Sequence, residues 1–161
     1  MLKFSNKKIL NIVLLLSLLI LSSAFYIQNI LKHEACNLCI FQRVPYFLAI
    51  IVILLNMFII DLKKYVFVFL LIIFLSGAVL SFYHFGIEQG LFSESLVCDL
   101  NTKSNSISKE ELLKSLKAEK ISCKNVTFRI LGLSLATINA IISLVLSGIM
   151  IKAIKNYGQN K

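Results

Sequence analysis

The sequence predicts an all-α integral membrane protein, a single four-helix domain covering residues 1–161. Of these residues 58% are hydrophobic and 16% are charged, whereas soluble domains average about 45–50% apolar and about 25% charged residues. The mean hydropathy of +0.84 points the same way. Four stretches approach or reach the ~17–25 apolar residues that a membrane-spanning helix needs. These stretches are Ile9–Ile30, Val44–Ile60, Tyr65–Phe85 and Phe128–Ile151.

The first stretch also has some features of a cleaved signal peptide. Lys3, Lys7 and Lys8 form a basic start, and Ser22-Ser23-Ala24 fits a small-residue cleavage site. The apolar character nevertheless continues to Ile30. We therefore expect a retained span, which an intact mass starting near Phe25 would contradict.

The basic residues predict the orientation, because cytoplasmic segments of membrane proteins carry an excess of lysine and arginine. With both termini in the cytoplasm, the inner segments hold eight cations against the single acid Asp61, and the outer segments hold nine cations against seven acids. The inner cations are Lys3, Lys7, Lys8, Lys63, Lys64, Lys152, Lys155 and Lys161. We attribute the net charge of +9 mostly to topology and expect no nucleic-acid partner.

In this orientation all four cysteines face the non-cytoplasmic side. Cys36 and Cys39 lie in a loop over about residues 31–43, and Cys98 and Cys123 lie in a longer loop over about residues 86–127. Exposed cysteines in an oxidising compartment usually form disulfides. Four cysteines allow three pairings, and the spacing does not choose among them.

The cysteines have three other conceivable uses: a zinc site, a haem site and static disulfides. A Cys₄ zinc site usually repeats the short spacing in both halves, but 24 residues separate Cys98 from Cys123. A c-type haem site needs a histidine where Ile40 stands. Static structural disulfides stay open as an alternative, and we expect no metal.

A redox role for Cys36 and Cys39 has more physical support. A C-x-x-C pair often has a lowered thiolate pKa when a cation or a helix N-terminus is near. Arg43 is such a cation, and Pro45 suits the first turn of the second span. The alternative for Arg43 is that it only extends its charge toward the membrane interface.

Two further features lie outside the cysteine motif. In the longer loop, Ser108 and Glu111 fit a capping box that starts a helix over about residues 109–120, lying on the membrane or packed on the protein. At the outer end of the third span, His84 is either an interfacial residue or a hydrogen-bond donor to a small molecule between helices.

Together these motifs resemble the disulfide bond formation protein B (DsbB) family. The resemblance rests on Cys36-x-x-Cys39-x-x-Gln42-Arg43, on "YHFGIEQG", on Cys98, and on Cys123 ahead of "LGLSLATINAIISLVLS". It extends over nearly the whole chain. The chain departs from the family pattern in its short ends, its short second span and its lack of tryptophan.

The resemblance implies a protein-thiol:quinone oxidoreductase of the bacterial inner membrane, with its cysteine loops in the periplasm. It implies Cys36–Cys39 and Cys98–Cys123 disulfides, with Cys98 attacked by a DsbA-like periplasmic oxidase of thioredoxin fold. Cys36 and Cys39 would pass the electron pair to ubiquinone or menaquinone, with Cys39 nearest the ring. Arg43 and His84 would polarise the quinone, whereas Gln42 has no assigned chemical role.

Three alternatives remain beside this interpretation. The chain could be a specialised paralogue with dedicated clients, or a non-catalytic scaffold with structural disulfides. A quinone-linked reductase similar to the vitamin K epoxide reductase family is less favoured, because that family carries its C-x-x-C on a late span, whereas here the motif follows the first.

Overall fold

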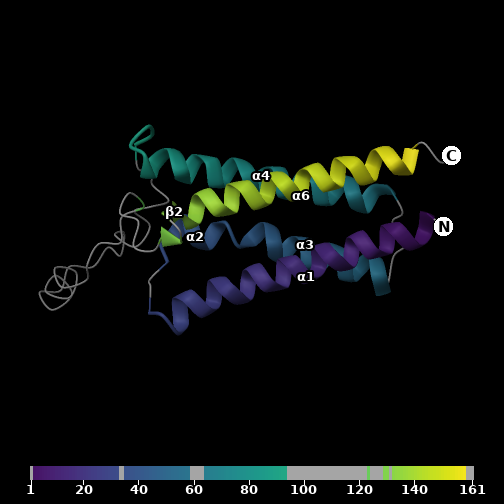
Figure 1. The fold of residues 1–161 in the computed structure, drawn as a ribbon, viewed down its shortest axis with the longest axis horizontal. Helices are drawn as coiled ribbons and strands as arrows, with labels where there is room; N and C mark the ends of the chain where they lie inside the picture. The colour runs from purple at the N-terminus through teal and green to yellow at the C-terminus, as the bar shows by residue number, and fades with distance from the viewer. Residues whose placement is uncertain are drawn as a thin grey trace, which may run out of the picture.

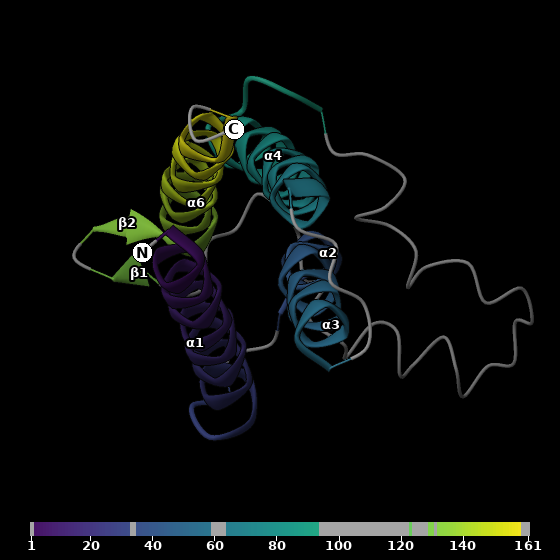
Figure 2. The same ribbon diagram turned by 90° about the vertical axis from the view of Figure 1, so that its right-hand side faces the viewer.

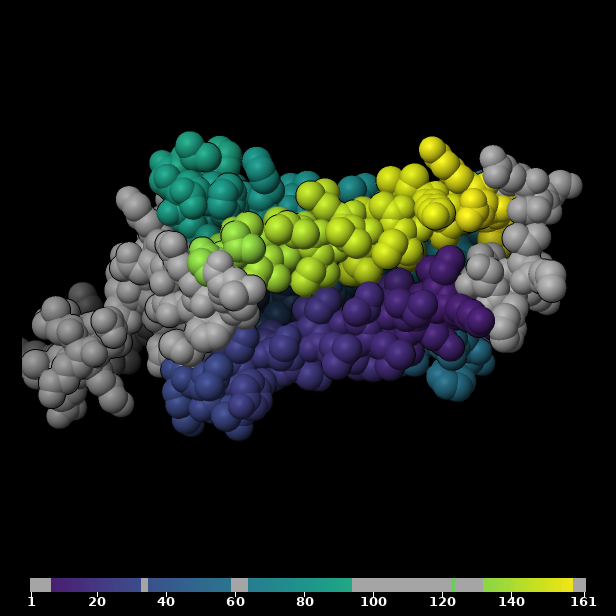
Figure 3. Space-filling view, in the orientation of Figure 1, coloured from purple at the N-terminus to yellow at the C-terminus, as the bar shows by residue number. Residues whose placement is uncertain are grey.

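The computed structural model describes residues 2–32, 35–58, 64–93, 123, 129–130 and 132–158. Four long helices lie side by side as a bundle, with both ends of the chain at the same end of it (Figure 1). They are α1 (Leu2–Asn29), α3 (Val44–Phe58), α4 (Lys64–Glu88) and α6 (Leu135–Gly158). Viewed along the bundle, the four helices occupy four corners (Figure 2). Figure 3 shows α1 and α6 running along one face.

The four-span prediction is confirmed. Four segments of the described chain are long and apolar enough to cross a membrane: Lys7–Asn29, Asn37–Phe58, Lys64–Glu88 and Leu135–Tyr157. The second of these contains the short helix α2 (Asn37–Phe41) followed by α3. The C-x-x-C motif therefore lies at the start of a span, and the fold is the all-helical membrane bundle that the composition predicts.

The fourth helix starts later than the sequence indicated. Strand β1 (Arg129–Ile130) pairs antiparallel with β2 (Leu133–Ser134) in a small hairpin, and Gly132 adopts φ 84° at its turn. Ser134 then caps α6, since its Oγ accepts a hydrogen bond from the Thr137 backbone N–H at 3.2 Å. The predicted helix over about residues 109–120 lies outside the described residues.

The core follows the helical period. In α1 the buried side chains are Leu10, Val13, Ser17 and Leu21, three or four positions apart, as expected for one face of a helix. Large apolar side chains such as Leu15, Phe69 and Leu144 remain exposed. Such a surface suits lipid, where helices satisfy their backbone hydrogen bonds internally.

At Gly77 the helices α3, α4 and α6 lie close together. A Cβ atom built there would lie 3.2 Å from Pro45 Cγ on α3 and 3.4 Å from Ser143 Oγ on α6. Small residues at helix contacts allow this approach in membrane proteins. Gly77 therefore lets three helices share one tight layer below the cysteine end.

The end of α4 is closed by a glycine cap. Gly90 has φ 74°, and the Leu91 N–H donates to the Gly86 carbonyl at 2.8 Å, which is the six-to-one bond of a Schellman motif. Phe92 then stacks on Tyr83, with ring centroids 5.6 Å apart. A side chain at Gly86 would overlap the Phe92 ring, so this glycine permits the folded-back end.

Candidate functional site

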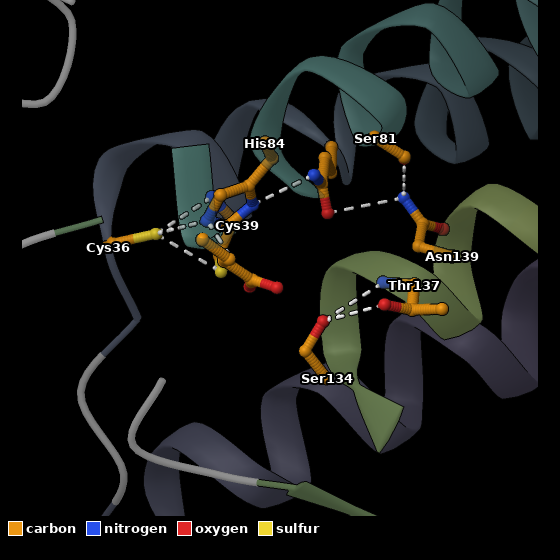
Figure 4. Close-up of polar contacts among 9 residues, drawn as sticks. Cys36, Cys39, Ser81, His84, Ser134, Thr137 and Asn139 are labelled. Carbon is orange, nitrogen blue, oxygen red and sulfur yellow. Dashed lines mark hydrogen bonds and ion pairs between the residues drawn. The ribbon is translucent and has the colours of Figure 1, made fainter. Parts of the chain in front are cut away.

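The C-x-x-C motif lies at one end of the bundle, against the last turns of α4. Figure 4 shows Cys36, Cys39 and His84 close together, with Asn139 and Ser81 deeper in the bundle. Cys36 is 8% exposed and His84 only 2%. Two of the predicted site residues, 48 positions apart in the chain, are therefore in contact.

Cys36 and Cys39 are free thiols in the structure, and their Sγ atoms are 3.2 Å apart. Cys36 is the N-cap of α2, and its sulfur accepts a hydrogen bond from the Cys39 backbone N–H at 3.4 Å. The helix N-terminus next to the thiols is therefore that of α2, which the motif itself forms, and not that of α3. The sulfurs are placed for closure, and the Cys36–Cys39 disulfide stays a prediction.

His84 is the second partner of Cys36. Its Nε2 lies 3.6 Å from Cys36 Sγ and 3.8 Å from Glu88 Oε1. The hydrogen bond from the Cys39 thiol lowers the pKa of Cys36, and hydrogen bonding and charge at His84 act in the same direction against the opposing effect of burial. A thiol with this environment forms a thiolate more readily than a free cysteine.

A buried polar network continues from His84 into the bundle. Gln42 Nε2 lies 3.0 Å from His84 Nδ1, and Gln42 Oε1 lies 3.3 Å from Asn139 Nδ2. Asn139 also donates to Ser81 Oγ at 2.7 Å and accepts a hydrogen bond from the Tyr46 hydroxyl. Three spans are joined here by polar side chains. Sequence reasoning did not single out Asn139, although a polar residue within an apolar span is a recognised functional signal.

Arg43 faces away from this network, toward α1. Its Nη1 donates to Gln28 Oε1 at 2.6 Å, and its guanidinium carbon lies 5.1 Å from the centroid of the Phe25 ring. Phe25 packs edge-on against Phe47, and both rings are partly exposed. The groups that lower the Cys36 pKa are Cys39 and His84, whereas Arg43 interacts electrostatically with Cys39, the second thiol of the pair. The expected role of Arg43 as the cation beside the motif stays a prediction.

The surroundings of Arg43 fit a quinone. Two aromatic faces and the lipid-exposed side chains of Ile40 and Val44 offer apolar surface, and the guanidinium offers donors for a carbonyl oxygen. His84, by contrast, is buried and already contacts Cys36 and Gln42. The predicted quinone contact of His84 stays a prediction, as does that of Arg43.

Cys123 belongs to the same end of the molecule. It is disulfide-bonded and 3% exposed, and it forms one buried cluster with Cys36, Leu38 and Ile87. Cys98 lies outside the described residues, so the Cys98–Cys123 pairing stays a prediction. One cysteine from each predicted pair is thus found in one apolar cluster.

The fold and the site define a multi-pass helical membrane protein with a thiol pair at one end of the bundle, one thiol buried and the other partly buried. Comparison with known proteins agrees: the family model described as "Disulfide bond formation protein DsbB" matches residues 6–153. The chain belongs to the DsbB family, whose members are membrane oxidoreductases of disulfide formation.

The chain is also 31% identical over 147 residues to "Uncharacterized protein RP370" of Rickettsia prowazekii (strain Madrid E), covering 89% of this chain and 86% of that protein. No solved structure matches this chain.

Proposed function

We propose that this protein reoxidises a DsbA-like periplasmic thiol oxidase by disulfide exchange and passes the electrons to a membrane quinone. The observation that carries the proposal is the shared cluster of Cys36 and Cys123, with Cys39 Sγ 3.2 Å from Cys36 Sγ. Exchange requires a thiolate to reach a disulfide sulfur. One cysteine of each pair in a common cluster suits such a relay.

The first exchange takes place with the partner. A partner thiolate attacks Cys98, the Cys98–Cys123 bond breaks, and Cys123 leaves as a thiolate. The partner's second thiolate then displaces Cys98, so the partner departs oxidised. Two electrons have entered this protein, and Cys98 and Cys123 are reduced.

The second exchange moves the electrons inward. The Cys123 thiolate attacks Cys36 of the Cys36–Cys39 disulfide and releases Cys39. Cys98 then attacks Cys123, reforming the outer disulfide and releasing Cys36 as a thiolate. A low thiol pKa speeds departure of the leaving sulfur, so the surroundings of Cys36 favour this last step.

The acceptor side involves Arg43. A quinone held here would supply the two-electron acceptor that the relay needs: Cys36 and Cys39 would give up two electrons, and two protons would be taken up, as their disulfide re-forms. The Arg43 guanidinium would hold the acceptor's carbonyl oxygen, and its charge would favour negative charge developing there. The pairing with Gln28 Oε1 and the Phe25 ring holds the side chain in place for that contact. Ubiquinone and menaquinone would both suit this site.

A turnover assay tests the proposal. The purified protein is mixed with a reduced thioredoxin-fold dithiol protein and with a soluble ubiquinone or menaquinone analogue, and loss of quinone absorbance is followed. We expect turnover by the wild type and none by Cys39→Ser. Full turnover by Cys39→Ser would refute the relay, and a wild type without turnover would favour the scaffold with structural disulfides.

The order of transfer has its own test. Cys123→Ala should accumulate a mixed disulfide between Cys98 and the partner, because the resting partner of Cys98 is gone. Non-reducing gels and mass spectrometry identify the linked peptides. If the linkage instead depends on Cys36, the assignment of the outer and inner pairs is wrong. Turnover with one dedicated client and not with a general oxidase would identify a specialised paralogue.

A further inference from the structure

Gln42 is a residue to which the relay gives no role, yet it is 6% exposed and lies between His84 and Asn139. A buried amide is costly unless both its ends are hydrogen-bonded. Its orientation therefore depends on what its two neighbours can donate or accept. That orientation in turn determines which nitrogen of His84 carries the proton.

The direction of the network can be followed from Ser81. The Ser81 hydroxyl donates to the Gly77 carbonyl at 2.8 Å, so its oxygen faces Asn139 as an acceptor. Asn139 consequently turns Nδ2 toward Ser81, at 2.7 Å, and its oxygen toward the Tyr46 hydroxyl. The amide of Asn139 is thereby fixed at both ends.

The same direction continues to the histidine. The second hydrogen of Asn139 Nδ2 points at Gln42 Oε1, 3.3 Å away. Gln42 must then present Nε2, a donor only, to His84 Nδ1 at 3.0 Å. Nδ1 is therefore the acceptor, and a neutral His84 carries its proton on Nε2. This proton faces Cys36 Sγ at 3.6 Å.

We propose that Gln42, oriented by Asn139, is a positioning residue that keeps the proton of His84 on Nε2, where it is donated to the Cys36 thiolate. Gln42 acts through His84 and touches neither partner nor quinone. Its importance for turnover rests on the proposed function. The tautomer itself is a property of the reduced protein alone.

Among the described residues, few other titratable groups lie near His84 Nε2 and Cys36 Sγ. Glu88 is the other charged group that faces His84, with its Oε1 3.8 Å from Nε2. Cys36 also faces the Cys39 thiol, and Tyr83 packs against the cluster. Cys123 packs there as well but is disulfide-bonded and does not titrate. The lowered pKa of Cys36, to which His84 contributes, agrees with donation from Nε2.

The same geometry bears on metal binding. Ligand atoms of Cys36, Cys39 and His84 lie within 4.8 Å of one another, and sulfur and imidazole are ligands that zinc prefers. A metal at this point would need the lone pair of Nε2. Gln42 places a proton on that nitrogen, so the arrangement favours a thiolate donor over a metal ligand.

The tautomer is tested directly by ¹⁵N NMR of histidine-labelled reduced protein. The chain has only two histidines, so His33→Gln assigns the signals. We expect His84 to show protonated Nε2 and unprotonated Nδ1 while it is neutral. A protonated Nδ1 in the wild type would overturn the proposal without any variant having to fold.

The effect on Cys36 is tested by the pH profile of its alkylation with iodoacetamide, followed by peptide mass spectrometry. Gln42→Met keeps the side-chain length but removes the donor, and Asn139→Leu frees the Gln42 amide to turn. We expect the profiles of both variants to move to higher pH, with an alkylation rate at acid pH about tenfold lower, the factor that one pKa unit implies.

Ser147→Ala is the matched control, because it removes a buried hydroxyl of α6 that donates to the Ser143 carbonyl at 2.8 Å and leaves the bond between Asn139 and Gln42 in place. Its profile should coincide with that of the wild type. A Gln42→Met profile that does not move, or an equal shift in Ser147→Ala, would overturn the proposal. The NMR and alkylation experiments contain neither partner nor quinone. If they give the expected tautomer while the wild type shows no turnover in the quinone assay, only the proposed function is rejected.

Discussion

At the scale of single residues, three groups lie against the Cys36 thiol. As the cap of α2 its Sγ accepts a hydrogen bond from the Cys39 backbone N–H, and it also lies 3.2 Å from Cys39 Sγ and 3.6 Å from His84 Nε2. Burial opposes ionisation, but the hydrogen bonds outweigh it and lower the pKa. The side chain is thus built to be a stable thiolate and a good leaving group.

The lowered pKa of Cys36 determines how the reactivity of this thiol changes with pH. A lowered folded-state pKa keeps Cys36 ionised at pH values where an ordinary thiol, with a pKa of about 8.5, is protonated. In the reduced protein, Cys36 should react with iodoacetamide well below that pH, and the reaction should fail only as the pH falls through its own lowered pKa. The denatured protein is the control and should show the ordinary profile. Coincidence of the two profiles would contradict the geometry.

The lowered pKa of Cys36 also makes the folding stability of the reduced protein depend on pH. The thiolate contributes folding stability that is fully present above the ordinary thiol pKa and is lost as the pH falls toward the lowered one. This contribution exists only in the reduced protein, since a disulfide does not titrate.

Arg43 carries a separate prediction. Arg43→Ala should raise the KM for quinone at least several-fold, because a charge-assisted hydrogen bond is worth about 1.5–3 kcal/mol. Folding should change little, since the side chain is only half-buried. Gln28→Ala, which removes the 2.6 Å partner but keeps the cation, should give a smaller rise. Unchanged quinone kinetics in Arg43→Ala would mean that the arginine merely reaches the interface.

How much of the site was predictable depends on sequence distance. Cys36, Cys39 and Arg43 stand out because they lie within eight positions of each other and of the start of a span. The bond between Gln42 and Asn139 joins residues 97 positions apart. No local spacing in the sequence reveals such a contact. The orientations of the Gln42 and Asn139 amides are defined only once the helices are packed together.

At the scale of elements, α2 shows how a short polar segment becomes structure. The stretch reads as loop in the sequence, yet Cys36 caps it and five residues form a helical turn ahead of α3. The start of α6 was predicted too early for a related reason. Residues before Leu135 are apolar, but Arg129–Ile130 and Leu133–Ser134 pair as strands, and Ser134 supplies the cap.

The close layer at Gly77 gives a prediction for the packing of α4. Gly77→Leu should destabilise the protein by about 1–3 kcal/mol, as overpacking of a well-filled interior does, because Pro45 and Ser143 already contact the Cβ position. Gly148→Leu in α6 is the matched control, since nothing lies within 4 Å of its Cβ position. Thermal unfolding in detergent measures both variants. Equal midpoints would show that the layer is not tight.

At the scale of the whole molecule, α2, whose N-cap is Cys36, lies at the end of the bundle opposite both chain ends (Figure 1). Cys123 packs in one cluster with Cys36. The orientation of that bundle in the membrane was inferred from charge. Hydrophobic length and helical period sufficed for the four spans, since a spanning helix satisfies its own backbone. The bounds of the polar connections depend on caps and hairpins, which leave weaker signals.

Paired positions on α4 test the orientation. In a protein whose four native cysteines are serines, Tyr65→Cys and Leu91→Cys place thiols at opposite ends of one helix, at sites 68% and 72% exposed. With the outer membrane permeabilised, an impermeant maleimide should label position 91 in intact cells and position 65 only after lysis. The reverse pattern would place the C-x-x-C motif in the cytoplasm.

The uneven distribution of polar contacts along the bundle has a mechanical consequence. Lipid supplies little hydrophobic drive for helices to associate, so packing and interhelical hydrogen bonds hold them together. Tyr46, Ser81 and Asn139 tie α3, α4 and α6 immediately beneath the thiols, whereas Leu10, Phe67 and Met150 meet through apolar contact. Interhelical hydrogen bonds therefore hold three helices together at the end that carries the thiols. In detergent or on heating, the helices should separate first at the end of the bundle where the two chain ends lie.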